Sequence, residues 1–225
     1  MYLSLLCLNP ASAAVQRDLR DVAELHRTVL SAFPNLNAAE VGARNSLGVL
    51  HRLEFERSTG RILLYVQSLT VPDWSGLPDG YLLQEAEIPN PAVKSVAEAY
   101  DCLKSGQVLR FKLRANPTRK IDTKSGPDGT RRNGRRVPVS GTAAQVEWLA
   151  RKAADHGFEI LNVSVAASGS AELARSHRRG CTFQGVVFEG SLAVRDPERF
   201  RDVLAKGLGS GKAFGFGLLS VAPPA

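Results

Sequence analysis

Apolar residues recur along the first part of the chain with two different periods. Residues 2–8 form an almost continuous apolar run, which predicts a buried strand. A loop is expected next, and then a helix from Asp21 to Ala32, because Val22, Leu25 and Val29 recur at helical spacing. The chain therefore opens with a strand and then an amphipathic helix.

The rest of the first half predicts a small sheet followed by another helix. Strands are expected at residues 47–55 and 61–68, and residues 58–60 (Ser-Thr-Gly) supply a hairpin turn between them. The apolar run at 81–88 is expected to extend this sheet. A helix is predicted over 92–103, where the first half ends.

The second half shows the same order of elements with clearer signals. Residues 108–114 alternate apolar and basic side chains, which predicts a strand with one buried and one cationic face. A basic loop follows. A helix, two strands, a helix and a last strand are then expected at residues 142–156, 158–163, 182–194, 196–207 and 213–221.

The order strand, helix, strand, strand, helix, strand is the ferredoxin-like pattern. The first half resembles a degenerate copy of it. We therefore predict an α+β protein of two tandem ferredoxin-like (RRM-like) domains with antiparallel sheets. The expected domains are residues 1–98 and 99–225, with the junction near residues 95–105.

The positive charge of the chain is concentrated in one segment. Residues 110–136 hold ten Lys and Arg against two Asp, a local charge of +8 within a chain whose net charge is +7. The remainder is therefore almost neutral. Positive charge concentrated in a glycine-containing loop favours a surface that binds the phosphates of a nucleic acid. The alternative is a solvent-exposed loop that binds no partner. A second cationic cluster comprises Arg175, His177, Arg178 and Arg179.

The segment from Gly207 to Gly217 holds further candidates for anion binding. Its glycines allow the backbone to approach a ligand closely, and Lys212 adds a positive charge. The spacing is neither that of a P-loop nor that of a dinucleotide fingerprint. The alternative is that the segment is only a helix cap followed by a bulged strand, although such a structure needs fewer glycines than are present.

Proton-transfer chemistry is the form of hydrolysis that this sequence favours. It contains no HExxH element, no acidic metal-binding pattern and no GxSxG, and its three cysteines are widely spaced. We expect no metal and no cofactor. Histidine is the natural proton carrier near neutral pH, and the chain has four, at positions 26, 51, 156 and 177.

Several short segments together resemble the CasE-type CRISPR endoribonucleases. The segments are Met1-Tyr2-Leu3-Ser4, Leu25-His26-Arg27, Phe33-Pro34, Arg114-Ala115-Asn116-Pro117, Arg136-Val137-Pro138, Phe188-Glu189-Gly190 and residues 215–220. The glycine spacing from Gly207 to Gly217 also fits the wider family. The resemblance covers almost the whole chain and implies two ferredoxin-like domains.

The resemblance also implies an activity and a partner. Such enzymes bind the stem-loop of each CRISPR repeat and cut at the 3′ base of the stem without a metal. The 2′-hydroxyl attacks the adjacent phosphate, leaving a 2′,3′-cyclic phosphate and a 5′-hydroxyl. The enzyme then keeps its product and joins the other subunits of Cascade. For this chain we expect a cytoplasmic protein, without a membrane segment, that is a monomer when free.

The resemblance assigns the catalytic role to His26. The residues expected to bind RNA lie in the helix, the basic segment, the second cationic cluster and the glycine-rich segment. They are Arg27, Arg114, Asn116, Arg119, Lys120, Lys124, Arg131, Arg132, Arg135, Arg136, Arg178, Arg179, Gly209, Ser210, Gly211, Lys212, Phe214 and Gly215.

One position departs from the family pattern. Relatives carry a tyrosine three residues before the histidine, and this chain has Ala23 there. A tyrosine's role in orienting or activating the nucleophile must therefore be filled by another group, such as Lys212 or Arg27, or is absent. Two other functions stay open at this stage: a non-catalytic RNA-binding subunit of the same fold, and a basic nucleic-acid-binding module outside CRISPR biology.

Overall fold

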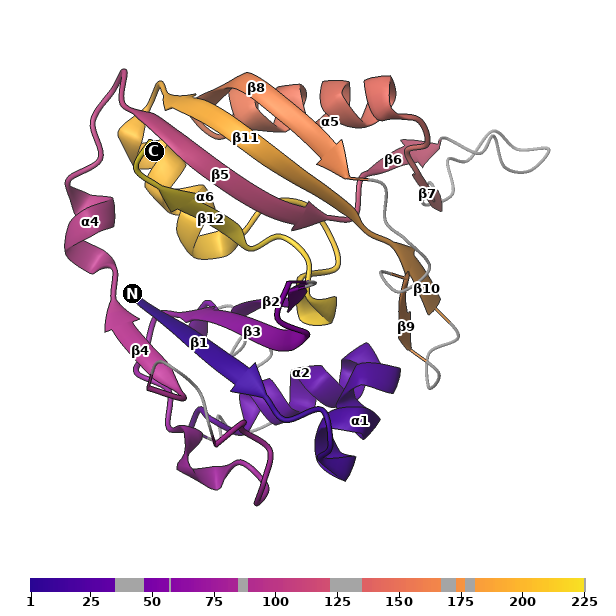
Figure 1. The fold of residues 1–225 in the computed structure, drawn as a ribbon. Coiled ribbons are helices and arrows are strands. Elements are labelled where there is room, and N and C mark those ends of the chain that lie inside the picture. Colours follow the sequence, from indigo (N-terminus) through magenta and orange to yellow (C-terminus); the bar gives the residue numbers. More distant parts are fainter. Residues whose placement is uncertain are drawn as a thin grey trace, which may run out of the picture.

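Two four-stranded antiparallel sheets form the two halves of the molecule (Figure 1). The structure is a computed structural model and describes residues 1–34, 47–56, 58–84, 89–121, 135–166, 173–176 and 181–224. The strand order is β2-β3-β1-β4 in the N-terminal sheet and β12-β5-β11-β8 in the C-terminal sheet. Each order is that of a ferredoxin-like domain, so the predicted tandem fold is confirmed.

The N-terminal half runs from the first strand to a short helix that leads into the second half. Its elements are β1 (Tyr2–Leu8), α1 (Ala13–Arg20), α2 (Val22–Leu30), β2 (Leu50–Glu56), β3 (Arg61–Ser68), the 3-10 turn η1 (Trp74–Gly76), β4 (Ala92–Ser95) and α4 (Ala97–Asp101). The apolar stripe predicted for the helix at Asp21 is present, and Asp21 caps it by accepting a hydrogen bond from the Ala23 N–H at 2.9 Å.

Three predicted elements of the N-terminal half are wrong. Part of the expected loop after β1 is the helix α1. The helix expected over 92–103 is β4 followed by α4, because residues 92–95 pair with β1 as the edge strand of the sheet. In the described part of the run 81–88, Leu82 makes an isolated bridge to Leu8 and no strand forms. Residues 85–88 lie outside the described part.

The C-terminal half follows the predicted order and adds two hairpins. Its elements are β5 (Val108–Ala115), β6 (Thr118–Ile121), β7 (Arg135–Pro138), α5 (Thr142–Asp155), β8 (Phe158–Ala166), β9 (Leu173–Ser176), β10 (Cys181–Gln184), β11 (Val186–Val194), α6 (Pro197–Lys206), the 3-10 turn η4 (Lys212–Phe214) and β12 (Leu219–Ala222). The strand expected over 182–194 is two strands, and the one expected over 213–221 is a glycine-rich turn followed by a short edge strand.

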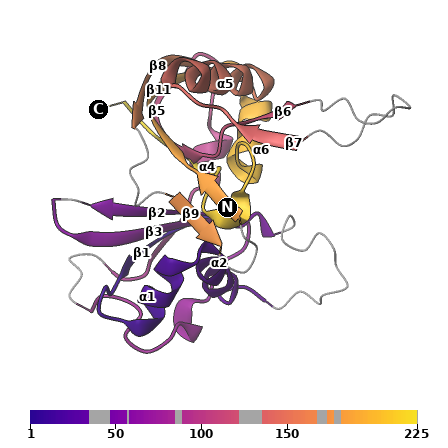
Figure 2. The ribbon, with the colours of Figure 1, turned by 90° about the vertical axis from the view of Figure 1, so that its right-hand side faces the viewer.

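Each sheet buries one face beneath its helices. In the C-terminal half, α5 and α6 cover the face of β5 that carries Leu109, Phe111 and Leu113. In the N-terminal half, α1 and α2 pack on the even-numbered residues of β1 and β3. Figure 2 shows α5 and the α1–α2 pair at opposite ends of the molecule. The other faces of the two sheets lie between them.

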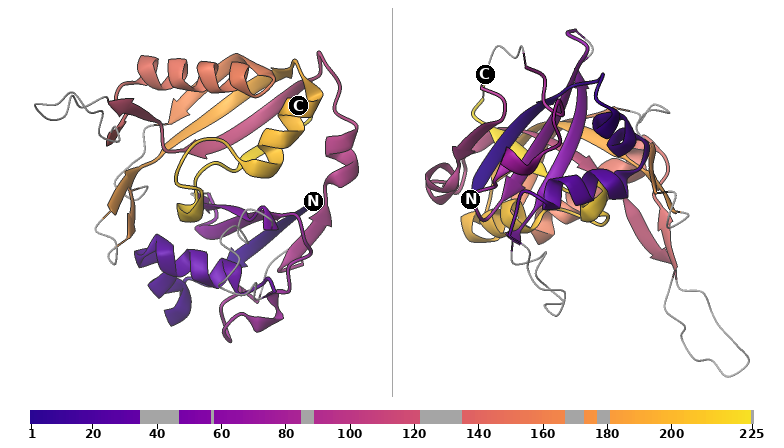
Figure 3. Two further views of the ribbon diagram at one scale, coloured as in Figure 1. Left: turned by 180° about the vertical axis from the view of Figure 1, so that it is seen from behind. Right: turned by 90° about the horizontal axis from the view of Figure 1, so that it is seen from below.

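The two hairpins extend from the C-terminal sheet. One hairpin pairs β6 with β7 and projects to the side of the molecule (Figure 3). The other pairs β9 with β10, and its strand β9 lies against α2 of the N-terminal half (Figure 1). The second hairpin therefore bridges the two halves.

A buried arginine joins the two halves directly. Arg52 on β2 is 3% exposed, and its Nη1 donates to the carbonyl of Leu218 at 3.1 Å and to the Ser220 hydroxyl at 3.0 Å. Its Nε bonds Glu54 at 2.7 Å, and Glu54 also pairs with Lys112 on β5 at 2.8 Å. Buried charges are stable in proteins when they are paired in this way, so this network holds β2 against the C-terminal sheet.

Candidate active site

A cavity of about 390 Å³ lies where the two halves meet. It is bounded by α2, the start of β2, the end of α6 and the glycine-rich turn. His26 lines it from α2, Leu50 from β2, and Lys206 and Lys212 from the other half. His26, the predicted catalytic residue, and Lys212, predicted to bind RNA, therefore line one cavity although they lie far apart in the chain.

Helix α2 fixes His26 at the edge of its apolar face. Leu25 and Val29 are buried in the core beneath the helix. His26 follows Leu25 and is 8% exposed, so its ring lies between the core and the cavity. The periodicity that buries Leu25 therefore also determines the direction of the neighbouring histidine.

A second histidine packs against His26. The rings of His26 and His51 are stacked, with centroids 5.7 Å apart and an angle of 21° between their planes. His51 is 1% exposed, and burial together with the charges of His26 and Arg114 lowers its pKa to about 3. His51 is therefore uncharged at neutral pH.

The glycine-rich segment brings Lys212 to the cavity. Gly211 and Gly215 flank η4 with φ angles of 81° and 80°, which a residue with a Cβ adopts only with strain. The resulting turn packs against α2 and β2. Burial, and then the charge of Lys206, lower the pKa of Lys212. A partly buried cation at this position is suited to an anionic group in the cavity.

A second, cationic pocket of about 320 Å³ joins the glycine-rich segment to the base of the β6–β7 hairpin. The Arg136 Nη1 donates to the Thr118 hydroxyl at 3.3 Å, and the Ser210 hydroxyl lies 3.5 Å from that hydroxyl. Lys152 and Lys206 also line the pocket. Sequence reasoning missed these two lysines, because each stands on a helix with an acidic partner, Asp155 or Asp202, and reads as a solvated side chain.

The predicted RNA-binding residues fall into three groups in the structure. Exposed cations on the hairpin are Arg119, Lys120 and Arg136, and Gly209, Ser210 and Lys212 line the cationic pocket beside it. The second group is packed into the molecule: Arg114 lies over the Phe216 ring at 5.0 Å, Asn116 is 8% exposed, Phe214 stacks on Phe183 at 4.5 Å, and Gly211 and Gly215 shape the turn. Arg27 is half exposed and pairs with Glu24.

Part of the predicted set lies outside the described residues. Lys124, Arg131, Arg132, Arg178 and Arg179 belong to it. Arg135 is part of β7, and its side chain is not described.

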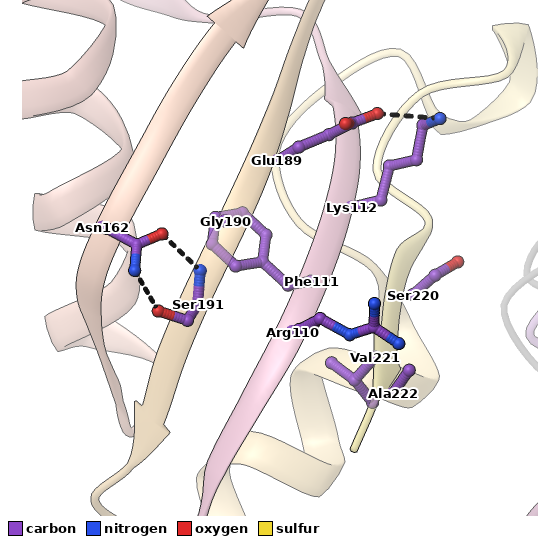
Figure 4. Close-up of a pocket in the computed structure, with 10 residues that line it drawn as sticks. All are labelled: Arg110, Phe111, Lys112, Asn162, Glu189, Gly190, Ser191, Ser220, Val221 and Ala222. Carbon is purple, nitrogen blue, oxygen red and sulfur yellow. Dashed lines mark hydrogen bonds and ion pairs between the residues drawn. The ribbon is translucent and has the colours of Figure 1, made fainter. Parts of the chain in front are cut away.

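The cationic face of β5 is not part of the hairpin surface. Lys112 pairs with Glu54 and Glu189 at 2.8 Å each, and the Arg110 Nε donates to the carbonyl of Pro223 at 3.0 Å. Figure 4 shows Lys112 and Arg110 in a separate pocket of about 610 Å³ on β5, β11 and β12. Among the described residues, the cations counted along 110–136 therefore do not all lie on one surface.

The described residues hold no group of three or more His, Cys, Asp and Glu side chains that could bind a metal ion. Within the same residues, no helix is long and apolar enough to cross a membrane.

Comparison with known proteins identifies the family of this chain. A family model described as "CRISPR associated protein" matches residues 1–223. The CRISPR-associated endoribonuclease Cse3 of Thermus thermophilus is 38% identical over 234 residues, which cover 99% of this chain and 100% of that protein. The CRISPR system Cascade subunit CasE of Escherichia coli is 30% identical over 210 residues, which cover 91% of this chain and 93% of that protein.

A solved structure extends the similarity to three dimensions. The Thermus thermophilus Cse3 structure bound to an RNA representing a pre-cleavage complex superposes with a TM-score of 0.78 at 37% identity, over 99% of this chain and 98% of that chain. The match of the family model over nearly the whole chain and the identity to both curated relatives agree with this superposition. The chain belongs to the CRISPR-associated protein family that includes these two relatives.

Proposed function

We propose that this chain is an endoribonuclease that binds the stem-loop of a CRISPR repeat and cuts the precursor transcript at the 3′ base of the stem. The observation that carries the proposal is the cavity at the junction of the two domains, which His26 and Lys212 both line. The relative from Thermus thermophilus is named as an endoribonuclease, and its solved structure with a pre-cleavage RNA adds support.

The chemistry needs two proton movements and no external cofactor. The 2′-oxygen bonds to the adjacent phosphorus and gives up its proton, while the bond from phosphorus to the 5′-oxygen breaks and that oxygen gains a proton. The products are a 2′,3′-cyclic phosphate and a 5′-hydroxyl. His26 is the group that moves one of these protons, and Lys212 stabilises the charge on the phosphate. Neither role requires a metal ion.

The surface that binds the RNA runs from the cavity over the cationic pocket to the β6–β7 hairpin. Arg119, Lys120 and Arg136 are exposed there, and Ser210 joins the hairpin base to the glycine-rich segment. Side chains read the deep major groove of A-form RNA poorly, so these cations contact phosphates. The predicted RNA-binding residues that lie outside the described part of the chain are proposed to contact RNA as well.

We also propose a protein partner for this chain and a boundary between its two domains. One relative is named as a subunit of Cascade, and we infer that this chain also stays with its RNA product and joins other Cascade subunits in the cytoplasm. Residues 1–98 form the domain that carries His26. Residues 99–225 form the domain that carries the hairpin and the glycine-rich segment.

A non-catalytic RNA-binding subunit is the second candidate function. The observation that favours it is Ala23, one helical turn before His26, at the position where the family resemblance implies a tyrosine. An alanine side chain offers no hydroxyl to orient the nucleophile. Binding of the repeat RNA without any cleavage would favour this second function.

Cleavage of repeat RNA in a chelator tests the proposed function. We expect the purified protein to cut the repeat RNA of its host in excess EDTA and to leave a 2′,3′-cyclic phosphate on the upstream product.

His26→Ala is expected to slow the single-turnover rate by about 10²–10⁴-fold with little change in RNA affinity, because a proton-transfer group is lost. Thr28→Ala on the same helix is the control. A 3′-hydroxyl product, or near-normal cutting by His26→Ala, contradicts the mechanism.

A further inference from the structure

His51 is a buried polar side chain that the proposed mechanism does not use. It is 1% exposed, and both of its ring nitrogens lack a hydrogen-bond partner in the part of the chain that the structure describes. Burying unsatisfied polar atoms lowers stability, and buried side-chain nitrogens nearly always have partners. An imidazole that is kept at such a cost indicates a role other than filling the core.

The strand geometry directs this ring toward α2. His51 pairs with Val66 across β2 and β3, and Val66 belongs to the core face that α1 and α2 cover. Adjacent residues of a strand point to opposite faces, so Arg52 points instead to the C-terminal half. The His51 ring thus lies beneath His26, stacked on it at a centroid distance of 5.7 Å.

The glycine-rich turn lies close to the His51 ring. A Cβ placed on Gly215 would lie 3.5 Å from the His51 Nε2 and 3.6 Å from its Cδ2, which is ordinary contact distance. The turn that carries Lys212 to the cavity therefore packs close to the same ring. His51 therefore stacks on α2 through His26 and lies close to the turn, the two elements that bring the candidate catalytic groups together.

Burial, and then the positively charged groups around it, lower the pKa of His51 and keep the ring neutral. His26 faces it from α2 and Arg114 from β5, and a protonated His51 would be repelled by both. On the glycine-rich turn, Lys212 adds a further positive charge near the cavity. A neutral His51 supports the His26 ring without competing with it for protons.

We propose that His51 is a positioning residue for RNA cleavage, whose buried, uncharged ring fixes the orientation of the His26 ring by stacking on it. This inference rests on the proposed function of His26. A reacting group must be held close to its productive geometry, and a displacement of about 1 Å can cost about 10²-fold in rate. His51 holds His26 through ring contact and transfers no proton itself.

Two substitutions of His51 separate ring contact from polarity. His51→Phe keeps a flat ring without nitrogens, and His51→Gln keeps polar atoms of similar reach without a ring. We expect His51→Gln to lower the single-turnover cleavage rate by about 10–100-fold, and His51→Phe by less than about fivefold, with little change in RNA affinity for either. Leu64→Ala, in the N-terminal core, controls for lost stability. It is expected to cut normally below its melting temperature.

Two further measurements test the mechanism of positioning. The pH–rate profile of His51→Phe is expected to keep the shape of the wild-type profile, because His51 does not titrate between pH 5 and pH 8. In NMR spectra of the RNA-free protein, the His26 ring protons are expected to lose the ring-current shift of the stacked neighbour in His51→Gln and to keep such a shift in His51→Phe.

The outcomes distinguish this inference from the proposed function. Absence of cleavage by the wild-type protein overturns the function, while the NMR shifts still report the ring contact. Wild-type rates in His51→Gln, or a His51→Phe protein that is folded but as slow as His51→Gln, overturn the positioning role. Loss of one limb of the pH–rate profile in His51→Phe overturns it as well, since His51 would then transfer a proton.

Discussion

His51 and Arg52 are neighbours in sequence and lie on opposite faces of the N-terminal sheet. His51 packs beneath α2 against His26, and Arg52 crosses to the C-terminal half, where it bonds Leu218 and Ser220. The two-residue period of a strand separates them. One short stretch of β2 therefore contributes both to the candidate active site and to the junction that positions it.

The depressed pKa of His51 makes stability depend on pH. Burial lowers its pKa from 6.5 to about 3, so between these values the unfolded chain binds a proton that the folded chain does not. The stability that neutral His51 contributes is thus present above pH 6.5 and is lost as the pH falls toward 3. We expect the wild type to lose about 2 kcal/mol more than His51→Phe between pH 7 and pH 5. Urea unfolding of both proteins at the two pH values measures this, and equal losses would contradict it.

At the scale of elements, the basic segment divides according to the partners of its side chains. The cations of β5 lie on the face turned away from α5 and α6, where Lys112 pairs with two glutamates. Those of the β6–β7 hairpin, such as Arg119 and Lys120, are exposed. An exposed cation can release counterions when it binds RNA, whereas a paired one contributes mainly to the fold.

Neutralising the hairpin should reduce the salt dependence of RNA binding. Each lost phosphate contact lowers the slope of log affinity against log salt concentration by about 0.7–0.9. We expect the double variant Arg119→Gln, Lys120→Gln to lower the slope by up to about two such steps. Its matched control is Lys94→Gln, Lys104→Gln, which removes two exposed lysines away from the hairpin. Equal slopes for the two double variants would mean that the hairpin is exposed to solvent and makes no contact with RNA phosphates.

At the scale of the whole molecule, the candidate active site exists only while the two domains keep their relative positions. His26 and His51 belong to the N-terminal half, and Lys212 belongs to the C-terminal half. The Arg52 network and the bond from the Gln67 side chain to the Leu204 carbonyl join these halves. The junction thus holds the cavity in shape.

Removing Arg52 is expected to destabilise the protein strongly. Arg52→Met leaves Glu54 with one cation fewer and leaves the Leu218 carbonyl without this donor. Breaking a buried pair costs about 3–5 kcal/mol. Arg195→Met removes the exposed pair with Glu159 and is expected to cost less than about 1 kcal/mol. Denaturant unfolding measures both, and similar losses would show that the network does not hold the junction.

The sequence by itself determined the tandem ferredoxin-like fold and most helices and strands of the second half. Local period and capping are sufficient there, as at Asp196, whose side chain caps α6 as its position before Pro197 predicts. The sequence also pointed to the glycine-rich segment, through its glycines and Lys212, and to His26, through the family resemblance. Their proposed roles in RNA cleavage stay predictions.

Only the tertiary structure decided which of these residues meet. The four residues of β4 carry too weak a local signal and form a strand because β1 offers its edge. The stack of His51 on His26 joins α2 to β2, and the charge of Lys112 on β5 is neutralised by Glu54 and Glu189 from other strands. The periodicity of a helix or strand fixes which way each side chain points. Only the packing of distant elements determines which groups that side chain contacts.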